Sequence, residues 1–543
     1  MATNLLHSIT RSLLKPFREH FLFLVVFFIF TAGTDIFRQI GLHNYTNTLY
    51  MAASGFCLAY AATLLVSWIK PQKPRTILQS LLLLITGISF IINFYCIFYL
   101  DDTFDKDYAL LLLETNPNEI KEFMTTMLPW WMVIILGALF LILAFAWRAS
   151  RRRNMNLGPK GSLIALVMVP LCLLVTVNKW NICKYGTTHR FKEFVKAYDS
   201  PYNLKQYYSH PSITGLDQNE MPGDVVLIIG ESFARFHSSL YGYDKLTNPK
   251  LGALRDSSLL FAYDSIDAAA ASTSLAFRYM MSTYSHADAA STAKHWYEYP
   301  SIIEMMQQCG YGCYWFSTQA RGGLINGSAR VFAKACDQTW FLQRPGSNLG
   351  NNLTLDELLV EASAPFVDTL SSTTHHFVVY HMMGSHFDYS MRYPQQYARY
   401  TARDYPNHLE SQRDILASYD NSILYNDEIV YELIELYRDR DAVVIYMPDH
   451  GQDMFRSAPD YYMHGRENDP VSYKCGVEIP FMIYMTPAFM QRHPATAQSI
   501  IDGHGNGSPW NSEDLPYTIL DLIGARGING QDVQARSVLT TRH

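Results

Sequence analysis

Acidic and histidine side chains follow three apolar, β-branched stretches of this sequence. Glu231 comes directly after the first stretch, Asp449 and His450 follow the third, and His386 lies a few residues beyond the second. If the stretches are parallel strands of one sheet, their carboxyl ends share an edge, and these side chains surround one crevice. Carboxylate oxygens and imidazole nitrogens are zinc ligands. The pattern predicts a metal site, which His464 can join by a loop.

Each of these groups has a simpler explanation when it is considered alone. Asp449 and His450 could cap a helix, and so could Glu231. His386 and His464 could be surface histidines. Their common position after apolar strands favours the metal site over these separate explanations.

A hydroxyl nucleophile is available in the segment 267–282, where Ser272, Thr273 and Ser274 follow a run of alanines. An apolar helical stretch comes next, which would place Thr273 at a helix N-terminus. Backbone N–H groups and the positive end of the helix dipole favour a phosphoryl group there. A metal ion at the same place would lower the pKa of the hydroxyl and activate it. An ordinary N-cap explains one hydroxyl but not the alanines.

The elements that position these residues follow Pro222, where short apolar runs alternate with helical stretches. This alternation is typical of an α/β domain with a largely parallel sheet. Strands are expected at 224–230, 312–316, 376–380, 441–446 and 479–484.

The first 180 residues have a different character, because they contain five apolar stretches. Each is about as long as the ~20 residues that cross a bilayer. A soluble bundle would show a polar face every 3.6 residues, and a signal peptide would show a small-residue cleavage site; neither is seen. Membrane spans are expected near 20–37, 49–69, 77–100, 127–147 and 162–178.

The distribution of Lys and Arg predicts the orientation of these spans. Basic residues precede the first span and lie between spans two and three and between spans four and five, whereas the loop 101–126 is acidic. The N-terminus is therefore expected in the cytoplasm, and an odd number of spans exports the rest of the chain. Three parts are predicted: a transmembrane domain of five helices (1–180), a bridging segment (181–221) and an exported catalytic domain (222–543).

Composition excludes two broad classes of protein. With 49% hydrophobic and 17% charged residues the chain is not disordered. Its net charge of −6 argues against a nucleic-acid binder that relies on bulk positive charge. The exported part has an odd number of cysteines, so at least one thiol stays unpaired within the chain, and a bond from Cys309 to Cys313 or Cys336 is open. These cysteines are Cys183, Cys309, Cys313, Cys336 and Cys475.

The stretch Gly230–Pro249 resembles the opening motif of bacterial phosphoethanolamine transferases, which are membrane-anchored members of the alkaline phosphatase/sulfatase superfamily. Five spans followed by an exported α/β domain of that superfamily is also the layout of this family. The resemblance continues through Thr273–Ser282, His381–His386, Tyr419–Asp427, Pro448–Gly451 and Met463–Gly465.

The resemblance implies a role for each matching residue. Glu231, Asp449 and His450 would bind one zinc ion, with Thr273 as both ligand and nucleophile. Thr273 is chosen over the serines on either side because it stands nine residues before Ser282, as in the family.

The resemblance also implies a second group of residues around the substrate. His386 and His464 match a histidine pair that binds a second metal ion or the substrate phosphate. Thr115 and Glu119 match part of the lipid donor pocket, although Leu111 replaces the asparagine that the family has upstream.

The sequence departs from the family at two further places. Two cysteines often bracket the nucleophile in a disulfide, but the corresponding positions are Ala269 and Tyr279. The motif at His450 continues with Gln452 and Asp453 in place of Glu and Ser. The first departure indicates a subfamily that is held together without those disulfides, and neither touches the predicted ligands.

The implied activity is transfer of phosphoethanolamine from phosphatidylethanolamine to an envelope acceptor, which could be lipid A, the lipopolysaccharide core or a periplasmic glycan. A phospho-threonine-type intermediate on Thr273 would carry the group, in the periplasm beside the bacterial inner membrane. The alternatives are a glycerol-phosphate transferase resembling lipoteichoic acid synthase, a sulfatase or phosphodiesterase, and a metal-free membrane sensor. No nucleic-acid partner is expected, and the oligomeric state is left open.

Overall fold

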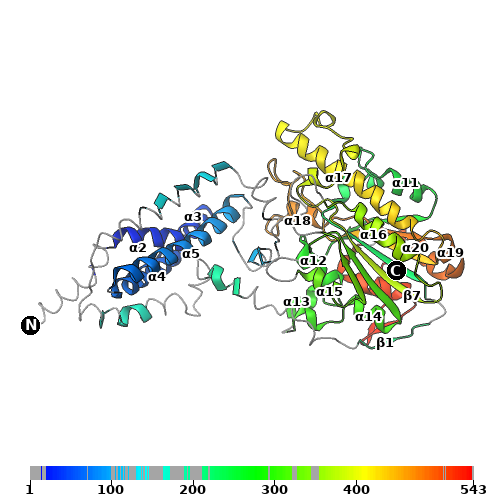
Figure 1. Cartoon of the computed structure of the whole chain (residues 1–543), viewed down its shortest axis with the longest axis horizontal. Helices are drawn as coiled ribbons and strands as arrows, with labels where there is room; N and C mark the ends of the chain where they lie inside the picture. Colours follow the sequence, from blue (N-terminus) through cyan, green and yellow to red (C-terminus); the bar gives the residue numbers. More distant parts are fainter. Residues whose placement is uncertain are drawn as a thin grey trace, which may run out of the picture. The chain divides into compact units, whose positions relative to one another are not determined.

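The structure of the protein is a computed structural model, and the chain divides into two compact units, residues 1–113 with 123–200 and residues 114–122 with 201–543 (Figure 1). We refer to them as the N-terminal and C-terminal units. The predicted boundaries at 180 and 221 stay a prediction. The described residues are 14, 20–69, 71–99, scattered positions between 104 and 195, 211–217, 221–291, 294–320, 327–343, 354–505, 507 and 509–540.

The N-terminal unit contains three helices that are long and apolar enough to cross a membrane: Phe21–Gly41, Tyr45–Trp68 and Gln72–Phe98. The first comprises α2 (Phe21–Phe28), a π-helical turn η1 (Ile29–Gly33) and α3 (Thr34–Gly41), and the others are α4 (Tyr45–Trp68) and α5 (Gln72–Tyr99). They coincide with the first three predicted spans. The fourth and fifth predicted spans fall mostly outside the described residues.

A buried polar cluster links distant parts of the N-terminal unit. Arg190 forms an ion pair with Asp35 of α3 at 2.8 Å, and both side chains are almost fully buried. Arg190 also donates to the Ser89 hydroxyl at 2.8 Å, and Asn93 of α5 donates to Thr34 at 2.8 Å. Since buried charges need partners, these contacts hold the first and third helices and the segment around Arg190 together.

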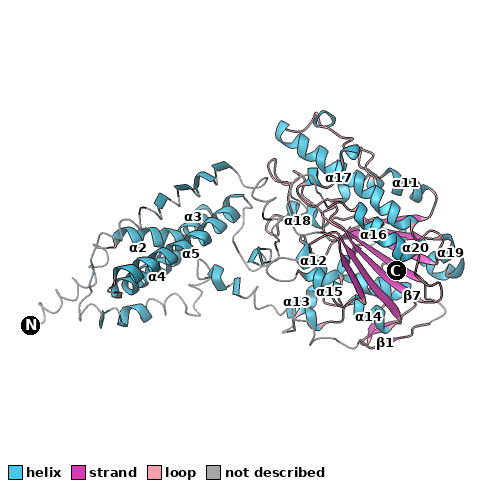
Figure 2. Ribbon diagram, viewed as in Figure 1, coloured by secondary structure: helices cyan, strands magenta, loops and turns pink. Residues whose placement is uncertain are grey.

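The core of the C-terminal unit is a β-sheet flanked by helices (Figure 2). The sheet has seven strands in the order β3-β9-β8-β2-β7-β5-β6. The strands from β8 to β6 are parallel, whereas β9 is antiparallel to both β8 and β3. The prediction of a largely parallel sheet is therefore confirmed, with one reversed strand. The strands are β2 (Asp224–Gly230), β3 (Leu260–Tyr263), β5 (Tyr311–Ser317), β6 (Gln338–Phe341), β7 (His375–His381), β8 (Ala442–Pro448) and β9 (Phe481–Met485).

Helices cover both faces of this sheet, and this explains why the central strands are continuously apolar. Along β2, Val225, Leu227 and Ile229 enter one core, and Val226 and Ile228 enter the other. The first core is closed by α12 (Thr273–Met280), α14 (Ile302–Gln308), α15 (Ser328–Ala333), α20 (Pro494–His504) and α21 (Leu515–Leu522). The second is closed by α11 (Pro249–Asp256), α16 (Glu357–Val367) and α17 (Glu410–Glu435).

Shorter elements complete the C-terminal unit. They are β1 (Ile213–Thr214), β4 (Ile266–Asp267), α13 (His286–Ser291), α18 (Pro470–Val477), α19 (Pro487–Arg492), β10 (Trp510–Asn511), β11 (Gly527–Ile528) and β12 (Gln531–Asp532).

The cysteines of the C-terminal unit are free thiols. Cys309, Cys313, Cys336 and Cys475 all lack a disulfide partner in the described part of the chain. Burial raises the pKa of Cys309 to about 11, so this thiol stays protonated at neutral pH. The pairing of Cys309 that the sequence left open is not formed, and Cys183 lies outside the described residues.

Candidate active site

The register of the two central strands brings two acidic residues together. Gly230 at the end of β2 is paired with Pro448 at the end of β8. The next residues are Glu231 and Asp449, and the Asp449 amide donates to the Gly230 carbonyl at 3.1 Å. The parallel pairing of β2 with β8 therefore sets both carboxylates beyond the same edge of the sheet.

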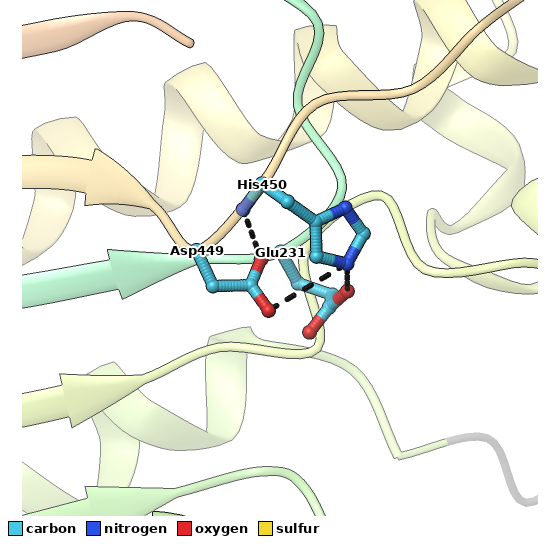
Figure 3. A group of neighbouring side chains, drawn as sticks. All are labelled: Glu231, Asp449 and His450. Carbon is cyan, nitrogen blue, oxygen red and sulfur yellow. Dashed lines mark hydrogen bonds and ion pairs between the residues drawn. The ribbon is translucent and has the colours of Figure 1, made fainter. Parts of the chain in front are cut away.

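Glu231, Asp449 and His450 converge beyond the ends of these strands (Figure 3). His450 Nε2 lies 3.2 Å from Glu231 Oε1 and 3.7 Å from Asp449 Oδ2. One ligand atom from each residue lies within 4.8 Å of the others, and all three residues are buried. The cluster has the spacing that a single cation requires.

Thr273 brings its hydroxyl into this cluster. It is the first residue of α12, after the extended residue Ser272, whose side chain does not cap the helix. Thr273 Oγ1 lies 3.4 and 3.3 Å from the two carboxylate oxygens of Glu231 and 3.3 Å from His450 Nε2. The structure thus unites the four residues that the sequence predicted at the metal site.

Close packing against α18 explains the alanines that precede Thr273. The Ala268 amide donates to the Val477 carbonyl at 2.7 Å. A Cβ on Gly476 would lie 2.9 Å from the Ala271 methyl group and 2.5 Å from the Cα of Gly465. Larger side chains in this segment would push the loop away from α18, so the alanines allow Thr273 to reach the carboxylates.

The donor set fits a cation such as zinc. Asp449 Oδ1 accepts hydrogen bonds from the amides of His450 at 2.8 Å and Ser232 at 3.3 Å. Asp449 Oδ2 is buried and has no hydrogen-bond donor among the described residues. His450 Nδ1 lies 2.7 Å from the Gly451 carbonyl and donates to it, so Nε2, which faces Glu231, is the nitrogen on which a cation would replace a proton. Two carboxylates, an imidazole and a hydroxyl match the ligands that zinc prefers.

The protonation of the three groups also indicates a cation site. Burial and the charge of Glu231 raise the pKa of Asp449 to about 8. Burial disfavours the charged form of His450, but the charge of Asp449 and contacts with Glu231 raise its pKa to about 9. Burial opposes ionisation of Glu231, yet His450 holds its pKa well below the usual range. At neutral pH the cluster retains protons that a cation would replace.

The two further histidines lie beside this cluster. The rings of His464 and His450 are 4.6 Å apart, edge to face at 81°. His386 is close enough for its charge to act on both Glu231 and His464. His386 Nδ1 lies 2.6 Å from the Phe387 carbonyl, so it donates there and leaves Nε2 available. The structure therefore brings all six predicted residues of the crevice together.

Gln319 is a site residue that the sequence analysis missed. Its Nε2 donates to Glu231 Oε2 at 3.0 Å and to the Met382 carbonyl at 2.9 Å. Gln319 stands two residues after β5, so the end of a fourth parallel strand was the signal that could have found it. An amide is not a typical zinc ligand, and Gln319 instead holds the candidate ligand Glu231 through a hydrogen bond.

The predicted donor pocket stays a prediction. Glu119 lies outside the described residues. Thr115 is described and partly buried.

Comparison with known proteins gives a consistent result for both units. Residues 223–525 match the sulfatase family. The phosphoethanolamine transferase EptC of Escherichia coli O18:K1:H7 is 23% identical over 465 residues, which cover 78% of this chain and 75% of that one. The resemblance to phosphoethanolamine transferases is therefore confirmed by relatives of that name.

Two solved structures share the fold. The integral membrane lipooligosaccharide phosphoethanolamine transferase A (EptA) of Neisseria meningitidis is 17% identical with a TM-score of 0.64, over 95% of this chain and 97% of that one. The periplasmic domain of EptC from Escherichia coli, solved in complex with Zn, is 22% identical with a TM-score of 0.52, over 61% of this chain and 89% of that one. With a family match over more than half its length, the chain belongs to the sulfatase family.

Proposed function

We propose that this protein is a metal-dependent transferase that moves phosphoethanolamine from phosphatidylethanolamine to an acceptor in the bacterial envelope. The position of the Thr273 hydroxyl carries the proposal. It lies at the N-terminus of α12 and within 3.4 Å of Glu231 and His450. A hydroxyl at this place is set for attack on a phosphorus atom.

Thr273 acts in two displacements. In the first, Thr273 Oγ1 loses its proton and bonds to the lipid phosphorus, and the bond from phosphorus to the diacylglycerol oxygen breaks. Diacylglycerol leaves with a proton, and phosphoethanolamine stays on Thr273. In the second, an acceptor oxygen bonds to the same phosphorus, and Thr273 Oγ1 regains its proton as its own bond to phosphorus breaks.

The surrounding residues bind and orient the transferred group. Glu231, Asp449 and His450 would hold a zinc ion, which when bound polarises the nucleophile and offsets the negative charge on phosphoryl oxygens. The first N–H groups of α12 donate to those oxygens. His386 and His464 bind the substrate phosphate or a second cation, and one of them, His386 or His464, passes a proton to a leaving oxygen.

The membrane helices keep this site beside its lipid donor. We propose five spans, a cytoplasmic N-terminus and a C-terminal unit in the periplasm against the inner membrane. Thr115 and Glu119 would contact the donor lipid. Lipid A, the lipopolysaccharide core and periplasmic glycans each offer a phosphate or hydroxyl oxygen as acceptor.

The first test replaces the nucleophile. Purified protein is incubated with phosphatidylethanolamine labelled in the headgroup, and the covalent adduct is located by mass spectrometry. Thr273→Ala should lose the adduct and lower transfer by roughly 10⁴-fold or more, the scale of losing a covalent nucleophile. Thr273→Ser keeps a hydroxyl and should retain an adduct.

Matched lipids separate the alternative activities. Phosphatidylglycerol labelled in its glycerol headgroup should give no adduct. Labelling by glycerol alone would favour the glycerol-phosphate transferase, and a fully active, correctly folded Thr273→Ala variant would exclude the proposed mechanism.

A further inference from the structure

A buried arginine lies close to the nucleophile and has no acidic partner in the described part of the chain. Arg278 belongs to α12 and is only 8% exposed. Its guanidinium makes one long hydrogen bond to described residues, from Nη2 to Ser274 Oγ at 3.4 Å, and its Nε is buried without a partner. A buried charge that is not paired is costly, so this arrangement requires an explanation.

The contact with Ser274 places the guanidinium over the first turn of α12. Long side chains in a helix point back toward its N-terminus, and Ser274 is the residue after Thr273. Ser272 leaves the first N–H groups of the helix without a side-chain cap. A guanidinium and the positive end of the helix dipole therefore lie at the end of α12 that carries Thr273.

Neighbouring aromatic residues account for part of the burial but offer no counter-charge. The Arg278 guanidinium lies 5.8 Å from the ring centre of Trp296, and its charge lowers the pKa of both Tyr279 and Tyr284, although burial raises the pKa of each overall. A cation–π contact of this length offsets only part of the cost of removing a guanidinium from water.

We propose that Arg278 forms an anion-binding subsite beside Thr273 and binds an oxygen of a phosphate group. Guanidinium groups bind phosphate through paired hydrogen bonds. Two sources share this chemistry: the phosphoryl group carried by Thr273, and a phosphate on the acceptor. The assignment of these sources rests on the proposed function, whereas the anion subsite does not.

Inorganic phosphate is the probe for the subsite. Its binding to the full-length, zinc-loaded protein is measured by calorimetry. Arg278→Gln should raise the Kd for phosphate at least tenfold. The Kd of Arg278→Lys should lie between the values of the wild type and of Arg278→Gln. Arg255→Gln is the matched control, because Arg255 is exposed and paired with Asp256 at 3.0 Å; its Kd should equal that of the wild type.

Folding is checked by thermal melting, and Arg278→Met, which keeps an apolar stem against Trp296, replaces the Gln variant if that variant unfolds. A wild-type Kd in whichever variant folds would overturn the proposal, and so would a wild-type protein that does not bind phosphate.

Separate half-reactions identify the source of the phosphate. A slower formation of the Thr273 adduct in Arg278→Gln assigns the subsite to the transferred group, and a loss confined to transfer onto phosphate-bearing acceptors assigns it to the acceptor. If the wild type transfers no phosphoethanolamine but its phosphate binding depends on Arg278, the proposed function fails and the subsite stands. If the wild type transfers phosphoethanolamine normally but its phosphate binding does not depend on Arg278, the proposed function stands and the subsite fails.

Discussion

Both carboxylate oxygens of Glu231 are held by side chains that are not themselves ligands. Oε1 accepts from the Ser232 hydroxyl at 2.7 Å, and Oε2 accepts from Gln319 Nε2 at 3.0 Å. Ser232 adopts a left-handed backbone conformation with φ of 56°, which is uncommon for a residue with a side chain. The backbone is thus strained at Ser232, where the chain leaves β2, and the hydrogen bonds from Ser232 and Gln319 fix the orientation of Glu231.

Removing the amide that holds Glu231 should weaken metal binding without removing a ligand. Loss of such an outer hydrogen bond typically costs about 10- to 100-fold in metal affinity, so Gln319→Ala should raise the Kd for zinc by that factor. The Kd is measured by competition with a chelator, and transfer at saturating zinc should recover most of its rate.

Gln498→Ala is the control, because Gln498 is an exposed amide on α20 that bonds only to Asp502 among the described residues. Equal zinc affinity in the Gln319 variant and this control would show that the hydrogen bond to Glu231 has no role in binding.

At the scale of elements, His286 connects the segments on either side of Thr273. Its ring stacks on Tyr279 of α12 at 4.3 Å, its Nδ1 lies 2.6 Å from Glu513, and it bonds to the Ala269 backbone. Ala269 and Tyr279 occupy the positions where the family often has a disulfide. The contacts of His286 therefore connect Ala269 with Tyr279, the two positions that a disulfide would connect.

This contact should make stability depend on pH. The hydrogen bond that His286 Nδ1 donates to Glu513 raises the pKa of His286. Burial opposes ionisation of Glu513, but His286 lowers the pKa of Glu513. The contact between protonated His286 and ionised Glu513 stabilises the folded state fully below the usual His pKa of about 6.5. This stabilisation is lost as the pH rises through the raised pKa of His286 in the folded state. His286→Gln should therefore lower the melting temperature more at pH 5.5 than at pH 9.

The effect should correspond to less than about 1 kcal/mol, because His286 is half exposed to solvent. His408→Gln changes an exposed histidine elsewhere in the C-terminal unit and should show no such pH dependence. A difference between wild type and His286→Gln that is the same at both pH values would contradict the role of the charged contact.

The sequence predicted these elements unevenly, for physical reasons. Strands β2, β7 and β8 are buried on both faces, so their apolar runs were visible, and parallel pairing then placed Glu231 beside Asp449. The reversal of β9 depends on how distant segments pair, which no local pattern records. The sequence did not indicate Gln319 because its role comes from a contact with a residue that follows another strand. The alanines before Thr273 are explained only by their close packing against α18, which is distant in the sequence.

At the scale of the whole molecule, one ion pair connects residues that are far apart in the chain. Arg190 forms an ion pair at 2.8 Å with Asp35 of α3, in the first of the three long apolar helices, and the two side chains are 5% and 4% exposed. Removing one partner of a buried pair leaves the other charge without compensation, whereas removing both is far less costly.

Arg190→Met should therefore destabilise the N-terminal unit by about 3–5 kcal/mol. The double variant Asp35→Asn with Arg190→Met should recover much of that loss, as measured by thermal melting of the full chain in detergent. Lys192→Met is the control, because Lys192 is exposed two residues away. Full stability in the single variant would show that the pair contributes nothing.

The order in which the chain is made has a consequence for the ligands that β2 and β8 bring together. A ribosome completes Glu231 and Thr273 long before Asp449 and His450, so an unfinished chain offers only half of the ligand set. The proposed cation site is therefore complete only at the end of biogenesis, after β8 has paired with β2. A premature stop codon anywhere ahead of residue 449 yields a polypeptide that lacks two of the four proposed ligands.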